Sequence, residues 1–183
     1  DGPESHPLTK KGTPTMGGLL ILIAVTTATL LWADLSNRYV WAVLIVTLGF
    51  GTIGFFDDYL KLSKRSSDGL PGKVKLVAEI AIAGGVAWWI SEITLDPLAT
   101  GLAVPFFKNL LIDLGWFFIP FAALVMVGAS NAVNLTDGLD GLAIVPAMIV
   151  AGCLALITYI VGNQVFSIYL QVYNVPGAGE LTV

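Results

Sequence analysis

Five apolar segments limit the fold of this chain more than any other feature of its sequence. They cover approximately residues 16–33, 39–56, 74–90, 116–132 and 142–161. A helix of about 20 apolar residues is long enough to cross the hydrocarbon core of a bilayer. Each segment is close to that length, so the sequence predicts an all-α integral membrane protein, a polytopic helix bundle with about five transmembrane helices.

The overall composition supports this fold class. Hydrophobic residues make up 56% of the chain and charged residues 12%, and the mean hydropathy is +0.83. Soluble domains carry about 25% charged residues, so a soluble globular fold is excluded. No repeat or change of composition divides the sequence, and we expect a single transmembrane domain over residues 1–183. The single cysteine, Cys153, excludes a disulfide within the chain.

The stretch between the third and fourth spans has a different pattern. Residues 91–115, "SEITLDPLATGLAVPFFKNLLIDLG", contain Pro97, Gly101 and Pro105 between short apolar runs. Prolines and glycines at such positions interrupt a helix and favour turns. We expect a short extracytoplasmic hairpin or an interfacial segment here.

The basic residues predict the orientation of the helices. Residues 1–15, 57–73 and 133–141 are separated from one another by two spans each, so they must lie on one face of the membrane. That face holds or borders seven of the nine basic residues, and the other face holds only Arg38 and Lys108. Basic residues collect on the cytoplasmic side of membrane proteins, so the three loops are expected to be cytoplasmic.

The first of these loops contains a candidate anion site, "KKGTPTMGG", Lys10 to Gly18. Pro14 and the paired glycines fix a turn at the start of a helix, where free N–H groups attract anions. Lysine and threonine beside such a turn suit phosphate. A juxtamembrane basic pair followed by a turn that starts a helix is the alternative.

The second loop begins with adjacent acids, Asp57 and Asp58, in "GFFDDYLK". Two neighbouring carboxylates repel each other, and Mg²⁺ shared with substrate phosphates would relieve that repulsion. Adjacent helical residues point about 100° apart, so the two acids should have different roles. The alternative is a solvated acidic helix end balanced by Lys61 and Lys64.

The third loop carries "NAVNLTDGLDGLA", Asn131 to Ala143, with Asn134, Asp137 and Asp140 close to two glycines. The glycines weaken a regular helix, which favours a loop that converges on a ligand. Capping of the next helix would explain one aspartate and not the whole group. Glu79, four residues after Lys75, is more simply an ion pair at the membrane interface than a proton carrier.

Four stretches taken together resemble a known family. They are "DGPESH", "KKGTPTMGG", "IGFFDDYLK" and "NAVNLTDGLDGLA". In this order, and separated by spans, they are similar to the phospho-N-acetylmuramoyl-pentapeptide-transferases of the polyprenyl-phosphate N-acetylhexosamine-1-phosphate transferase superfamily. The resemblance implies Mg²⁺-dependent transfer of phospho-MurNAc-pentapeptide from UDP-MurNAc-pentapeptide to undecaprenyl phosphate, giving lipid I and UMP in peptidoglycan synthesis. It also implies a bacterial inner membrane protein with a cytoplasmic active site. A homodimer is compatible with the resemblance, and no nucleic-acid partner is expected.

The resemblance assigns roles to individual residues. It places Lys10 and Thr15 in the nucleotide-sugar site, and Asn134, Asp137 and Asp140 near the nucleoside and diphosphate. Asp57 and Asp58 match the essential acidic pair. We expect Asp57 to accept the proton of the lipid phosphate and Asp58 to bind or orient the metal, because phosphoryl transfer depends on positioning and charge neutralisation. A covalent aspartyl route stays open.

Two other functions remain to be distinguished. A sibling enzyme that uses UDP-GlcNAc would share the acidic pair and the membrane plan. A transporter would need polar residues near the middle of its spans, whereas here they collect at one face.

The sequence also predicts that these 183 residues are part of a longer protein. There is no initiator Met, and the family's later aspartate-containing loop and histidine-rich loop are absent. We therefore expect this segment alone to be inactive as an enzyme, because a Mg²⁺ site that lacks one of its oxygen ligands holds the ion weakly.

Overall fold

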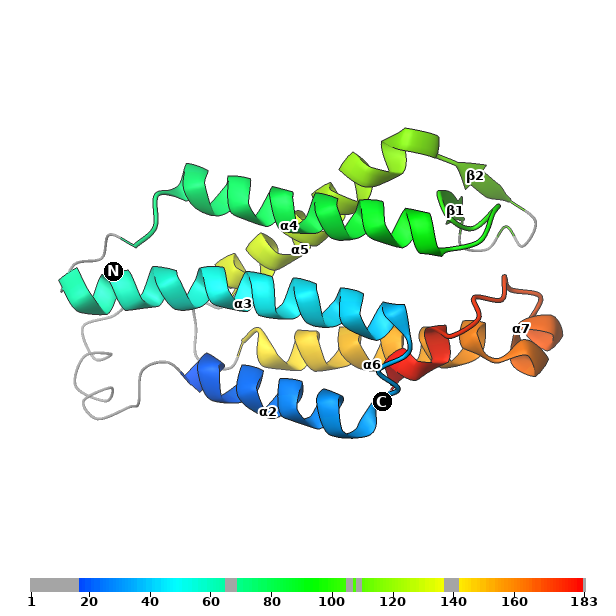
Figure 1. The fold of residues 1–183 in the computed structure, drawn as a ribbon, viewed down its shortest axis with the longest axis horizontal. Helices are drawn as coiled ribbons and strands as arrows, with labels where there is room; N and C mark the ends of the chain where they lie inside the picture. Colours follow the sequence, from blue (N-terminus) through cyan, green and yellow to red (C-terminus); the bar gives the residue numbers. More distant parts are fainter. Residues whose placement is uncertain (1–16, 65–68, 105–106, 108–109, 137–141, 183) are drawn as a thin grey trace.

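The computed structural model describes residues 17–64, 69–104, 107, 110–136 and 142–182. Five helices run back and forth along the long axis of the molecule (Figure 1). They are α2 (Gly17–Trp32), α3 (Arg38–Lys64), α4 (Gly72–Ile93), α5 (Phe118–Thr136) and α6 (Ile144–Gly162). The start of α4 and α6 and the end of α3 and α5 therefore lie at the same end of the bundle.

The prediction of an all-α polytopic membrane protein is confirmed. Four of the described helices, α3 to α6, are long and apolar enough to cross a membrane, and α2 is a shorter apolar helix of 16 residues. Neither α2 nor α6 contains a buried residue, and most of their large apolar side chains are exposed. Such apolar surfaces suit the interior of a bilayer better than water.

Small residues bring α3, α4 and α5 into contact. Ala83 of α4 packs with Ala123 and Val127 of α5 in the buried core. Gly49 of α3 lies against Ile82 of α4, so close that a Cβ atom at residue 49 would be 2.9 Å from Ile82 Cδ1. Without a hydrophobic driving force between helices in lipid, close packing of this kind holds the bundle together.

The expected hairpin is present at the end of the bundle where α4 ends and α5 begins. Strands β1 (Gly101–Ala103) and β2 (Leu111–Asp113) pair antiparallel, and a short 3₁₀ helix, η1 (Gly115–Phe117), leads into α5. Thr100 Oγ1 donates to Asp113 Oδ1 at 2.6 Å, and the Gly115 N–H donates to the same oxygen at 2.9 Å. These two hydrogen bonds, that of Thr100 first, hold the pKa of Asp113 below its ordinary value.

The last described segment folds back against α6 and α3. Helix α7 (Gln164–Leu170) is capped by Asn163, and η2 (Ala178–Thr182) packs on α6 and α3. Asn37 Nδ2 donates to the Gly177 carbonyl at 2.7 Å, and the Asp34 N–H donates to Glu180 Oε1 at 2.7 Å. These bonds join η2 to the turn between α2 and α3.

The contact between α6 and η2 requires a glycine at residue 162. A Cβ atom there would collide with the backbone of Gly179. We predict that Gly162→Ala lowers the melting temperature of the protein in detergent, since forcing a methyl group into a filled site costs about 1–3 kcal/mol. Thermal unfolding followed by circular dichroism measures the change.

Gly152→Ala is the matched control for this experiment, because it lies in the same helix and has no atom within 4 Å of a Cβ built there. Alanine is about 1 kcal/mol better than glycine inside a helix, so this variant should melt at the same temperature or higher. Equal melting temperatures for the two variants would show that the glycine contact does not hold η2 in place.

Candidate acidic and cationic site

The adjacent acids lie in the last two turns of α3 and face different surroundings. The side chain of Asp57 is 18% exposed and that of Asp58 is 62% exposed. Because neighbouring positions in a helix are rotated by about 100°, only one of two adjacent side chains can face α4. Asp57 takes that position and Asp58 faces outward.

Both oxygens of Asp57 accept hydrogen bonds. Lys61, one turn along α3, donates from Nζ to Oδ2 at 2.5 Å, and the Leu70 N–H donates to Oδ1 at 2.7 Å. Gly69 lies so close that a Cβ atom there would collide with Asp57 Oδ1. Asp57 thus fastens the end of α3 to the backbone just before α4.

Asp58 is the more open carboxylate. Its Oδ1 is 3.7 Å from Lys61 Nζ, so the same ammonium group lies near both acids. A cation near two carboxylates reduces their mutual repulsion.

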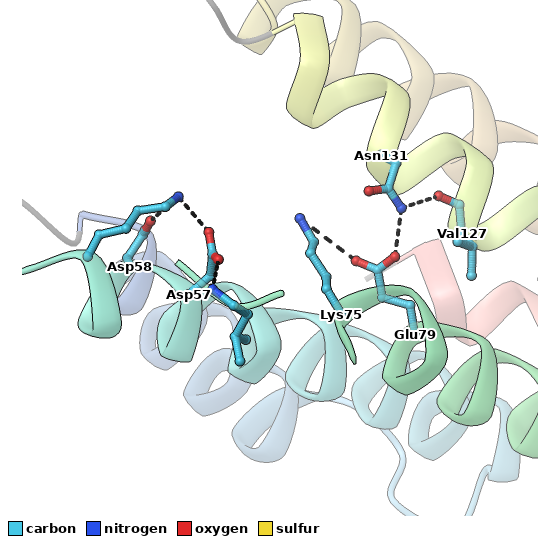
Figure 2. Close-up of polar contacts among 8 residues, drawn as sticks. Asp57, Asp58, Lys75, Glu79, Val127 and Asn131 are labelled. Atoms are coloured by element: carbon cyan, nitrogen blue, oxygen red, sulfur yellow. Dashed lines mark hydrogen bonds and ion pairs between the residues drawn. The ribbon is translucent and has the colours of Figure 1, made fainter. Parts of the chain in front are cut away.

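A second polar cluster lies beside the acidic pair, and the sequence did not identify it as a site. Figure 2 shows Lys75 between the acidic pair and Glu79, with Asn131 of α5 above the Glu79 carboxylate. Lys75 Nζ is 4.0 Å from Glu79 Oε1, and Asn131 Nδ2 donates to Glu79 Oε2 at 2.6 Å (Figure 2). Three helices therefore contribute charged or amide groups to one end of the bundle.

The sequence predicted the Lys75 and Glu79 pair of this cluster, but not the contact with Asn131. The expected pair of Lys75 and Glu79 is confirmed, because residues four apart lie on one face of a helix. Asn131 is 52 residues away from Glu79, and no local pattern connects the two.

Asn134 is the described member of the predicted polar loop, and its position differs from the expectation. Helix α5 continues to Thr136, so Asn134 lies in its last turn, with an exposed side chain, and not in a loop. The helix continues because no glycine or proline follows Gly128 before Gly138. Lys10, Thr15, Asp137 and Asp140 lie outside the described residues.

The oxygen donors at this end suit a hard cation. Within the described parts of the chain, no group of three or more His, Cys, Asp or Glu side chains is placed to hold a metal ion. Mg²⁺ often binds through one or two carboxylates, with water and substrate phosphates completing its shell. The exposed carboxylate of Asp58 fits that type of site, whereas Asp57 is less exposed and accepts a hydrogen bond on each oxygen.

Comparisons with known proteins show the family of this chain. Residues 40–178 match the family described as glycosyl transferase family 4, and residues 10–22 match phospho-N-acetylmuramoyl-pentapeptide-transferase signature 1. A phospho-N-acetylmuramoyl-pentapeptide-transferase of Granulibacter bethesdensis is 64% identical over 183 residues, all of this chain and 51% of that protein. The chain thus spans about half the length of this curated relative. It belongs to glycosyl transferase family 4 and carries the sequence signature of the phospho-N-acetylmuramoyl-pentapeptide-transferases.

Proposed function

We propose that the protein containing this segment transfers phospho-MurNAc-pentapeptide from UDP-MurNAc-pentapeptide to undecaprenyl phosphate. The observation that carries the proposal is the acidic pair of α3 beside Lys61 and Lys75 at one end of a membrane bundle. The name of the Granulibacter relative and the signature at residues 10–22 support this choice of sugar.

The reaction is an exchange of phosphate partners. A phosphate oxygen of the lipid attacks the β-phosphorus of the UDP-sugar, and a new P–O–P linkage forms. The bond from the β-phosphorus to the bridging oxygen breaks, and that oxygen leaves with UMP. The lipid product is lipid I. Such transfers depend on alignment and on neutralising the phosphate charge, for which the cluster of carboxylates and ammonium groups is suited.

Asp57 and Asp58 take separate parts in this proposal. Asp57 accepts the proton of the lipid phosphate. Lys61, which already contacts both acids, neutralises the negative charge on the phosphate. Asp58, with its exposed carboxylate, would hold Mg²⁺, which when bound neutralises the diphosphate as a Lewis acid. Asp57 accepts one hydrogen bond on each oxygen, from Lys61 and from the Leu70 N–H, and a second lone pair on either oxygen can take the proton of the lipid phosphate.

The remaining substrate contacts follow the resemblance of the motifs. Lys10 and Thr15 would bind the nucleotide sugar, and Asn134, Asp137 and Asp140 would lie near the nucleoside and diphosphate. Asn134 lies in the last turn of α5, and α5 and α3 end at the same end of the bundle, which supports this role. The face that carries these residues would be cytoplasmic, because it holds or borders seven of the nine basic residues.

Replacement of the acids tests the catalytic part of the proposal. In the full-length transferase containing this segment, Asp57→Asn should lower UMP release by about 10²–10⁴, because the amide cannot accept a proton and keeps a similar shape. Asp58→Asn should in addition raise the Mg²⁺ concentration needed for half-maximal turnover. UMP release is measured separately with UDP-MurNAc-pentapeptide and with UDP-GlcNAc, in the presence of undecaprenyl phosphate.

Asp96→Asn is the control for charge loss, because Asp96 is exposed and follows α4 at the opposite end of the bundle. Turnover of this variant should match that of the parent. Near-normal turnover of Asp57→Asn would contradict its role as the base, and release of UMP only from UDP-GlcNAc would reassign the sugar.

Labelling of single cysteines tests the orientation. Cys153 is exposed and is first changed to serine. Cysteines at Ser63 and Thr136, both exposed at the end with the acidic pair, should react with an impermeant reagent only from the cytoplasmic side. A cysteine at Leu95, which is 78% exposed at the other end, should react only from outside. Labelling of Ser63 and Thr136 from opposite sides would exclude a shared site.

A further inference from the structure

Glu79 is the buried charged side chain among the described residues, at 2% exposed, and it lies within a helix that is apolar enough to cross a membrane. A carboxylate buried in such a place is unfavourable unless charged or hydrogen-bonding partners surround it. Charged residues buried in membrane-spanning helices are candidates for a functional role, and the partners of the two carboxylate oxygens indicate that role.

The two oxygens of Glu79 face different partners. Oε2 accepts from Asn131 Nδ2 at 2.6 Å, and the same amide nitrogen donates to the Val127 carbonyl at 2.9 Å (Figure 2). Asn131 is thus held by its own helix, and it holds Glu79 in turn. Oε1 remains on the side of Lys75.

The contact with Lys75 is an attraction at longer range. Lys75 Nζ is 4.0 Å from Oε1, which is too far for a hydrogen bond. The lysine side chain is 23% exposed, and within the described parts of the chain its three N–H donors make no hydrogen bond, so they can bind another anion. A long lysine side chain adopts many conformations, and a fixed carboxylate beside it restricts where the ammonium group lies.

We propose that Glu79, supported by Asn131, is a positioning residue that holds the Lys75 ammonium beside the acidic pair, where Lys75 binds a substrate phosphate. Figure 2 shows the arrangement on which this rests: Lys75 lies between Asp57 and Glu79, and α3, α4 and α5 each contribute one part. The inference depends on the proposed phosphoryl transfer. The phosphate belongs either to the diphosphate of the nucleotide sugar or to the lipid, and the experiment separates these two sources.

The variant Glu79→Gln removes the charge and leaves an oxygen that can still accept from Asn131. In the full-length transferase, we expect KM for one of the two substrates to rise about tenfold while kcat changes less than about twofold, because ground-state binding of phosphate is lost. A higher KM for UDP-MurNAc-pentapeptide assigns Lys75 to the diphosphate, and a higher KM for undecaprenyl phosphate assigns it to the lipid. Glu79→Asp, which keeps the charge, should restore part of the affinity.

Glu92→Gln is the matched control, because Glu92 lies in the same helix, is exposed, and is close to the end of α4 away from the site. It should leave both KM values unchanged. If Glu79→Gln behaves like Glu92→Gln in an active enzyme, the positioning role is wrong. If the parent enzyme releases no UMP from either UDP-sugar, the proposed function itself fails, and the two failures are therefore distinct.

A double-mutant cycle with Lys75→Met distinguishes positioning from a general effect on packing. The cycle is measured as the Kd of each substrate by calorimetry in detergent, so that slow turnover does not limit it. We expect Glu79→Gln to weaken binding about tenfold in the parent and by less than about twofold when residue 75 is Met, because both changes remove the same interaction. Equal losses in the two backgrounds would overturn the proposal.

Discussion

The absence of water from the hydrocarbon core determines most of this structure. Every backbone N–H and C=O group there must form a hydrogen bond within the protein. These apolar segments form helices because a helix satisfies its backbone groups within one segment. Charged side chains are unfavourable at that depth, so they gather where the helices end. Asp57, Asp58 and Lys61 follow this rule at the end of α3. Glu79 departs from it, and Asn131 and Lys75 surround its carboxylate.

Close packing of α3, α4 and α5 allows these charged groups to meet. Gly49 lets α3 approach Ile82, and small residues let α4 approach α5. The acids of α3, the lysine of α4 and the amide of α5 consequently occupy one end of the bundle (Figure 2). Phosphoryl transfer needs this kind of arrangement more than it needs a reactive side chain, because alignment and charge neutralisation account for most of the catalysis. The bundle is therefore suited to the chemistry proposed for its family.

Local patterns in the sequence were sufficient for the helices, the hairpin and the ion pair of Lys75 with Glu79. These features depend on composition or on residues a few positions apart. The hydrogen bond from Asn131 to Glu79 could not be predicted, since it depends on how α4 and α5 meet. The bond from the Leu70 N–H to Asp57 could not be predicted either, since it depends on where the chain returns before α4. The helical position of Asn134 differs from the expected loop because α5 continues to Thr136, before the first of the two glycines. The roles of Lys10, Thr15, Asp137 and Asp140 remain predictions.

The bond between Asp57 and the Leu70 N–H also bears on the connector between α3 and α4. It closes a ring of chain that leaves α3 after Lys64 and returns at Gly69. Closing such a ring becomes only about 0.6 kcal/mol less favourable each time its length doubles. Insertions between residues 64 and 69 should therefore leave the acidic pair in place, provided that the glycine and the amide at the closing point are kept. The connector can acquire new surface features while the end of α3 that carries Asp57 and Asp58 is preserved.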